Sequence, residues 1–184
     1  MADKNGVRPG GRSARIQAAV HQAVHRLQQQ QGELTVPAIA ASAGVTPSTI
    51  YRRWGELAQL LSDVALERVR PDGEPRDAGS FREDLRAWLE QYIDEIATEP
   101  GRAILRDILA CPTSENADKC AEFTRQQIDI IRDRALARGE QVVDSDALID
   151  AVVAPLLYRL LFSRTPLSAK HALVLLDRML DTLS

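Results

Sequence analysis

The stretch Gly44–Trp54, GVTPSTIYRRW, decides how the first part of this chain folds. Pro47 suits the first turn of a helix, where its missing N–H costs nothing, and Thr46 can cap that helix. Ile50 and Trp54 are four residues apart, so they share one helical face and can lock it onto neighbouring helices. The outward face then carries Ser48, Thr49, Tyr51, Arg52 and Arg53. This short helix has little to bury and a polar, cationic surface to present.

A second short helix precedes this one. Thr35 is suited to cap it, Ile39 and Ala43 point inward, and Gly44 ends it. Two short helices joined by a tight turn containing glycine predict a helix-turn-helix, whose second helix enters the DNA major groove. Hydroxyl and guanidinium groups are donors that reach phosphates and base edges, so the outward face predicts DNA binding.

Length and composition favour an all-α protein of one or two compact domains, and the residue pattern indicates about nine helices. The chain has 184 residues, 45% hydrophobic and only 4% aromatic, and few stretches alternate apolar and polar residues. We expect helices over 13–31, 36–43, 47–54, 56–69, 81–98, a short one from Pro100, 115–138, 145–162 and 169–183. These define a flexible basic arm (1–12), a helix-turn-helix DNA-binding domain (13–69), a linker (70–80) and a C-terminal ligand-binding and dimerisation domain (81–184).

Charge is distributed unevenly along the chain. Residues 1–70 hold nine Lys/Arg against five Asp/Glu, whereas residues 71–184 hold fourteen against twenty-one. A basic first third suggests a polyanionic partner for that third alone. Arg8, Arg12 and Arg15 of the arm can reach a groove or phosphates, or serve only to solubilise the chain. No apolar run approaches a membrane span and the N-terminus lacks a signal-peptide core, so we expect a cytoplasmic protein without membrane contact.

The longer stretch LTVPAIAASAGVTPSTIYRRWGELAQLLSDVA (34–65) resembles the N-terminal domain of the tetracycline-repressor (TetR) family of bacterial transcription regulators. The resemblance implies an all-α homodimer acting as a ligand-responsive repressor on a palindromic double-stranded DNA operator. It places Thr49 and Tyr51 at DNA-contacting positions, Thr35 near a phosphate, and Arg52 and Arg53 where operator choice is often set. A family lysine is replaced by Leu57. The full candidate set is Thr35, Thr46, Pro47, Ser48, Thr49, Tyr51, Arg52 and Arg53.

The C-terminal helices predict a homodimer. The segment ALIDAVVAPLLYRLLF (147–162) is apolar nearly all round, and the last helix has a broad apolar face, so a second copy is the economical cover. A helix wholly internal to a monomer is the alternative. The expected interface residues are Leu156, Leu157, Leu160, Leu173, Leu176 and Leu180. Arg159, within this segment, can pair with an acid across the dimer or meet an anionic ligand.

Apolar and amphipathic residues on the same helices can line a cavity for an unknown small-molecule effector, or simply form the core. They are Trp88, Tyr92, Ile96, Leu105, Ile108, Phe123, Ile128, Ile131, Tyr158 and Phe162. We expect such an effector to act through the helix at 56–69. The alternative function is a helix-turn-helix protein-interaction module without effector control.

The sequence argues against an enzyme, a cofactor or a metal site. His21 and His25 are spaced for two metal ligands, but no third ligand lies near them. Cys111 and Cys120 form no CxxC pair, and their expected state is two reduced thiols rather than a redox switch. The glycines of RPGGRS (8–13) lack the preceding strand that a phosphate-binding loop needs.

Overall fold

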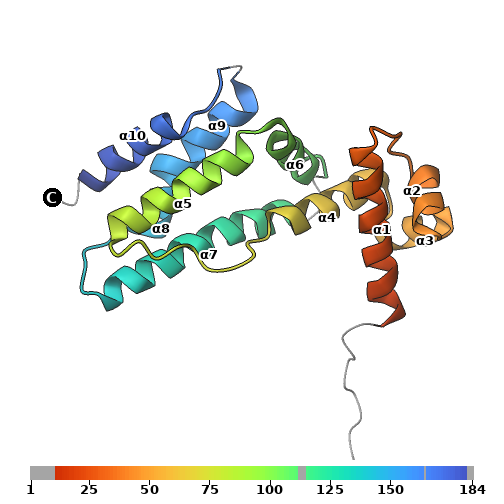
Figure 1. Cartoon of the computed structure of the whole chain (residues 1–184), viewed down its shortest axis with the longest axis horizontal. Coiled ribbons are helices and arrows are strands. Elements are labelled where there is room, and N and C mark those ends of the chain that lie inside the picture. Colours follow the sequence, from red (N-terminus) through yellow and green to blue (C-terminus); the bar gives the residue numbers. More distant parts are fainter. Residues whose placement is uncertain (1–10, 112–114, 164, 182–184) are drawn as a thin grey trace, which may run out of the picture. The chain divides into compact units, whose positions relative to one another are not determined.

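The computed structural model describes residues 11–111, 115–163 and 165–181, and every regular element in these ranges is a helix (Figure 1). The all-α class is therefore confirmed. The chain divides into two compact units, one ending at Val64 and the other beginning at Ala65. This division falls inside one helix rather than at the expected linker. Of the expected basic arm, residues 1–10, with Arg8, lie outside the described part.

The first unit is built from three helices and most of a fourth. They are α1 (Arg12–Gln29), α2 (Val36–Ala43), α3 (Pro47–Trp54) and α4 (Leu57–Val69), whose residues up to Val64 belong to this unit. Their core contains Val20, Val24, Ile39, Ile50, Trp54, Leu60 and Val64. Because α2 and α3 are too short to be stable alone, this shared core is what holds them as helices.

Local signals set most of these helix ends. The Thr35 hydroxyl accepts a hydrogen bond from the Ala38 N–H at 3.3 Å, and Gly44 ends α2 with a left-handed φ of 68°. The expected end of the first helix was wrong: α1 stops at Gln29, and Gln31, not Gly32, takes the positive φ of 52°. The fourth helix begins at Leu57 rather than Glu56.

The second unit contains the remaining helices. They are α5 (Phe81–Ile96), α6 (Glu99–Leu109), α7 (Asn116–Ala137), α8 (Ser145–Leu148), the π-helical turn η1 (Ile149–Val153), α9 (Ala154–Phe162) and α10 (Ala169–Leu180). Helix α5 is central, since it packs against α6, α7 and α10. Its side chains Leu85, Leu89 and Ile93 are at most 1% exposed. Ser80 caps α5 by accepting from the Glu83 N–H at 3.2 Å, the hydrogen bond that defines a capping box.

The expected continuous helix over 145–162 is interrupted by η1. Pro155, the second residue of the following helix α9, has no N–H to donate to the carbonyl one turn earlier, and a helix often widens or kinks at such a position. The α5–α6 corner has an equally local cause. A Cβ on Gly101 would lie 2.3 Å from the Glu95 carbonyl oxygen, so only glycine fits there.

The last helix ends at Leu180, and the expected continuation to 183 lies partly outside the described residues.

The expected linker at 70–80 contains no helix, yet side chains of the second unit hold it along its length. Gln127 donates to the Gly73 carbonyl at 3.2 Å, and Arg134 donates to the Pro75 carbonyl at 3.0 Å. The Ala78 N–H donates to the fully buried carboxylate of Asp84 at 2.5 Å. This segment, which we call the strap (70–80), is thus a fixed part of the second unit.

Candidate nucleic-acid interface and ligand cavity

Helix α3 is held by two residues on its inner face. Ile50 and Trp54 are 1% and 8% exposed, and the Trp54 indole N–H donates to the Asp63 carboxylate of α4 at 2.8 Å. The Trp54 ring also lies 6.1 Å, centroid to centroid, from the His21 ring of α1. These contacts fix which face of α3 is turned outward, in agreement with the four-residue spacing.

Three hydroxyls gather at the start of α3. Thr46 Oγ1 lies 2.9 Å from Ser48 Oγ and 3.0 Å from Thr49 Oγ1. The expected side-chain cap by Thr46 was wrong: the Thr49 N–H donates to the Thr46 backbone carbonyl instead, which leaves the hydroxyl to its hydroxyl neighbours. Ser48 is exposed, Thr49 is half-buried, and Pro47 is exposed at the first helical position.

The two arginines of α3 are in different situations. Arg53 is half-buried, donates from both terminal nitrogens to Ser13 Oγ at 3.0 Å, and lies 5.4 Å from the Trp54 ring centroid. Arg52 is exposed and has no hydrogen-bond or ion-pair partner in the described ranges. Tyr51 beside it is 52% exposed. The face that remains available to a partner is therefore centred on Ser48, Tyr51 and Arg52.

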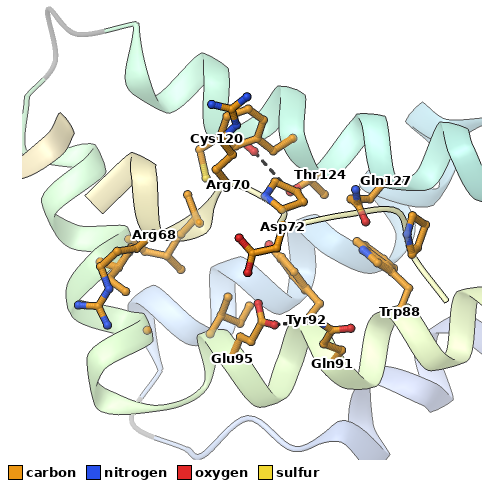
Figure 2. Close-up of a pocket in the computed structure, with 18 of the residues that line it drawn as sticks. Arg68, Arg70, Asp72, Trp88, Gln91, Tyr92, Glu95, Cys120, Thr124 and Gln127 are labelled. Carbon is orange, nitrogen blue, oxygen red and sulfur yellow. Dashed lines mark hydrogen bonds between the residues drawn. The ribbon is translucent and has the colours of Figure 1, made fainter. Parts of the chain in front are cut away.

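The second unit contains a cavity of about 500 Å³ (Figure 2). Its walls come from the end of α4, the strap, α5, α6 and α7. Five of the ten residues expected to line a cavity do so: Trp88, Tyr92, Ile96, Leu105 and Phe123. The Trp88 and Tyr92 rings stack with 5.3 Å between centroids and 17° between planes.

The other five expected cavity residues lie elsewhere. Ile108, Ile128 and Ile131 are buried at 2% exposure or less and do not border the cavity, because tight packing fills the space around them. Tyr158 and Phe162 are 67% and 74% exposed, since they lie on the outer face of α9. For these residues the sequence pattern alone could not separate core, cavity and surface.

Sequence reasoning missed the polar part of the cavity. Gln91 and Glu95 come from α5, and Cys120, Thr124 and Gln127 come from α7. Their helical spacing matches that of Trp88, Tyr92 and Phe123, so a stripe of polar residues beside the aromatic ones was the available signal. The wall formed by strap residues 70–75 had no such signal, because its position depends on distant contacts.

Burial keeps the interior of the cavity uncharged. Desolvation raises the pKa of the Tyr92 phenol well above its usual range, and a hydrogen bond with Thr124 offsets only part of this. Burial likewise raises the pKa of the Cys120 thiol, so the reactive thiolate is disfavoured. Thr124 donates its hydroxyl proton to the Cys120 carbonyl at 3.5 Å (Figure 2).

The expected interface leucines are mostly core residues. Leu156, Leu160, Leu176 and Leu180 are at most 4% exposed within a single chain, so the expectation that they form a surface was wrong. Leu157 and Leu173 are half-buried. A helix that is apolar all round does not reveal which side its own chain covers. The large apolar side chains left exposed on α9 and α10 are Tyr158, Phe162 and Val174.

No group of three or more His, Cys, Asp or Glu side chains in the described part of the chain is placed to hold a metal ion. None of the helices there has the length and apolar character that crossing a membrane requires.

Comparison with known proteins agrees with this arrangement. The profile described as "Bacterial regulatory proteins, tetR family" matches residues 24–64, and that described as "Tetracyclin repressor-like, C-terminal domain" matches residues 75–179. The chain is 29% identical over 160 residues to the HTH-type transcriptional regulator Rv1556 of Mycobacterium tuberculosis, covering 83% of this chain and 79% of that one. It is 32% identical over 111 residues to the HTH-type transcriptional regulator AqdR of Rhodococcus erythropolis, covering 58% and 53%.

Solved structures share the fold. The TetR family transcription regulator SCO0332 superimposes with a TM-score of 0.65 at 25% identity, over 90% of this chain and 97% of that one. A TetR transcriptional regulator from Agrobacterium tumefaciens gives 0.61 at 20% identity, over 91% and 93%. With a helix-turn-helix unit, a separate helical unit and both family profiles matched, the chain belongs to the TetR family of DNA-binding bacterial transcription regulators.

Proposed function

We propose that the protein is a ligand-responsive repressor that binds a palindromic operator as a homodimer. The observation that carries the proposal is the division of α3 into two faces. Ile50 and Trp54 fasten one face, and Ser48, Tyr51 and Arg52 are left outward. Guanidinium and hydroxyl donors on a rigidly held helix suit base edges and phosphates in the major groove.

The remaining candidate residues take supporting parts in this proposal. Arg53, held against Ser13, contacts the phosphate backbone, as does the α2 cap Thr35. Thr46, Pro47 and Thr49 shape the start of α3, and the hydroxyls among them add phosphate contacts. Since Leu57 supplies no charge at the start of α4, the arginines provide the cationic contacts.

DNA binding and its specificity can be tested together. Selection of random duplexes by the full chain should enrich a palindrome, because two dyad-related α3 helices read two half-sites. Affinity for the selected duplex should fall steeply with salt as counterions are released. Enrichment of a site without two-fold symmetry would contradict the dimeric mode. Binding that selects no duplex and ignores salt would favour the alternative, a protein-interaction module.

Dimerisation is proposed through the exposed apolar residues of α9 and α10. Tyr158 and Phe162 have ring centroids 5.3 Å apart, and Val174 on α10 is 40% exposed. The half-buried Leu157 and Leu173 complete the proposed interface. Exposed apolar side chains of this size are typical of surfaces that a partner covers.

The dimer surface has matched controls within the same unit. Tyr158→Glu and Phe162→Glu should shift the wild-type dimer toward monomer in sedimentation velocity. Leu109→Glu and Leu136→Glu alter side chains that are 53% and 51% exposed elsewhere, and should leave the dimer intact. A wild-type monomer at micromolar concentration, or equal effects from all four variants, would refute this interface.

Effector control is proposed to operate through the cavity and α4. Arg68 and Val69, at the end of α4, border the cavity together with strap residues 70–75. Leu60 and Val64, earlier in α4, belong to the core that also contains Trp54. Linkage requires that operator and effector alter each other's affinity by the same factor. An effector whose dissociation constant is unchanged by saturating operator DNA would contradict this part of the proposal.

A further inference from the structure

The cavity of the second unit contains features that select the charge of its occupant. Its deep polar groups are the Tyr92 phenol, the Cys120 thiol, the Thr124 hydroxyl and the Gln127 amide, and all of them are neutral. The charged side chains in its lining are all exposed; they are Arg68, Arg70, Asp72, Glu74 and Glu95. The charge preference of the site therefore depends on how those side chains point.

Two carboxylates face the open part of the cavity. Figure 2 shows Asp72 of the strap and Glu95 of α5 directed toward the same space, next to Tyr92. The guanidinium groups of Arg68 and Arg70 are turned away from that space (Figure 2). Gln91 donates to one oxygen of Glu95 at 2.9 Å, which orients the carboxylate.

Aromatic rings form the wall beside these carboxylates. Trp88 and Tyr92 are stacked on consecutive turns of α5, and Phe123 approaches from α7. Aromatic walls favour flat conjugated ligands by stacking, and tryptophan and tyrosine faces attract cations. A negatively charged ligand would gain the stacking but would meet Asp72 and Glu95 without an inward-facing cation.

We propose that the cavity binds a planar aromatic cation, a heterocycle with a quaternary or protonated nitrogen, which lies against Trp88 and Tyr92 and pairs with Glu95 and Asp72. Its volume of about 500 Å³ lies within the ~300–1,000 Å³ typical of drug-sized ligands. This inference rests on the proposed effector role of the cavity and adds the chemical class of the effector.

Three probes of nearly equal shape separate the charge classes. The full-length protein without DNA is titrated calorimetrically, at mildly alkaline pH, with 10-methylacridinium (positive), acridine (neutral) and acridine-9-carboxylate (negative). We expect the cation to bind roughly fivefold more tightly than acridine, as one partly exposed ion pair allows, and the anion to bind most weakly. Preference for the anion, equal affinity for all three, or binding of none would overturn the proposal.

Substitutions place the binding in this cavity. Glu95→Gln should weaken 10-methylacridinium binding roughly fivefold and leave acridine unchanged, because only the charge is removed. Glu90→Gln is the matched control, on the same helix and outside the cavity lining. Tyr92→Leu should weaken both aromatic probes. If Glu95→Gln and Glu90→Gln behave alike, the cation is not held by this carboxylate and the proposal fails.

Failure of this inference can be distinguished from failure of the proposed function. If the anion binds best and also weakens operator binding reciprocally, the effector role stands and only the charge class is wrong. If the cation binds as expected but operator DNA does not change its affinity, the cavity has the inferred ligand class and the effector role is refuted.

Discussion

Two pairs of arginines on two helices lie in opposite surroundings in this protein. Arg52 and Arg53 lie near the end of α3, where Arg52 is exposed and Arg53 contacts a serine hydroxyl and an indole ring. Arg134 and Arg138 lie near the end of α7 and are surrounded by acids and carbonyls of their own chain. The residue type is the same, but only one pair retains its capacity to bind an external anion.

The α7 pair converges on one buried carboxylate. Arg138 reaches Asp84 at 3.0 Å and Arg134 reaches it at 3.6 Å, while Asp84 itself is completely inaccessible. Arg138 also pairs with Asp77 of the strap at 3.3 Å, and Arg134 donates to the Pro75 carbonyl. A buried charge must have partners, so this network fixes the strap in place. The contrast teaches that partner placement, rather than charge, separates a structural arginine from a binding one.

The largest expected effect comes from removing the centre of the α7 network. Asp84→Ala leaves two largely buried guanidinium groups without their shared partner, and should destabilise the second unit by about 3 kcal/mol. Urea denaturation measures this loss. Asp84→Asn keeps an oxygen that can accept from the Ala78 N–H, so its loss of stability measures the contribution of the charge alone. Asp77→Asn, at a 59% exposed site, should cost under ~1 kcal/mol; an equal loss there would break the contrast.

The next effect concerns the free member of the α3 pair. Arg52→Ala should weaken specific DNA binding by about 1–3 kcal/mol, roughly fivefold to 150-fold, because a base or phosphate contact is lost. Stability to urea should not change, since Arg52 has no partner in the described ranges. Gel-shift titration on the selected palindrome at fixed salt measures the affinity. An Arg52→Ala protein with unchanged affinity would show that exposure does not identify the binding arginine.

A smaller effect sharpens the contrast within α3. Ser13→Ala removes the hydroxyl that accepts both hydrogen bonds from Arg53, but retains the guanidinium itself. DNA affinity should fall by under ~1 kcal/mol, since only the orientation of the half-buried Arg53 side chain is loosened. Arg53→Ala should lose more than Ser13→Ala in the same titration. The reverse order would indicate that Ser13 contacts DNA directly rather than positioning Arg53.

The smallest effect is a pH dependence at the edge of the α7 network. Glu140 accepts from the Phe81 N–H at 2.7 Å and pairs with Arg138, and these contacts lower its pKa below the usual 4.5. A carboxyl with a depressed folded-state pKa stabilises the fold above its unfolded pKa, and this contribution is lost as pH falls below that value. Denaturation of Glu140→Gln should therefore match that of the wild type more closely below pH ~4 than at pH ~7. A constant difference across this range would exclude the linkage.

The sequence by itself determined the elements that depend on neighbouring residues. Thr35, Gly44 and Pro47 placed the ends of α2 and α3, and the spacing of Ile50 and Trp54 gave the buried face of α3. The side chains of Ser80 and Asp144 likewise cap the starts of α5 and α8 by accepting from N–H groups of the next few residues. Caps, turns and helical periodicity act over a few residues, so the primary structure contains them.

Only the tertiary structure decided features that depend on residues far apart in the chain. It placed Leu156 and Leu176 in the core and left Tyr158 and Phe162 exposed, a choice that an all-round apolar helix does not reveal. It also turned the expected linker into a cavity wall, because Gln127 and Arg134 of α7 hold it across more than 50 positions of sequence. Burial and ion pairing at such separations arise from packing, and local sequence patterns do not specify them.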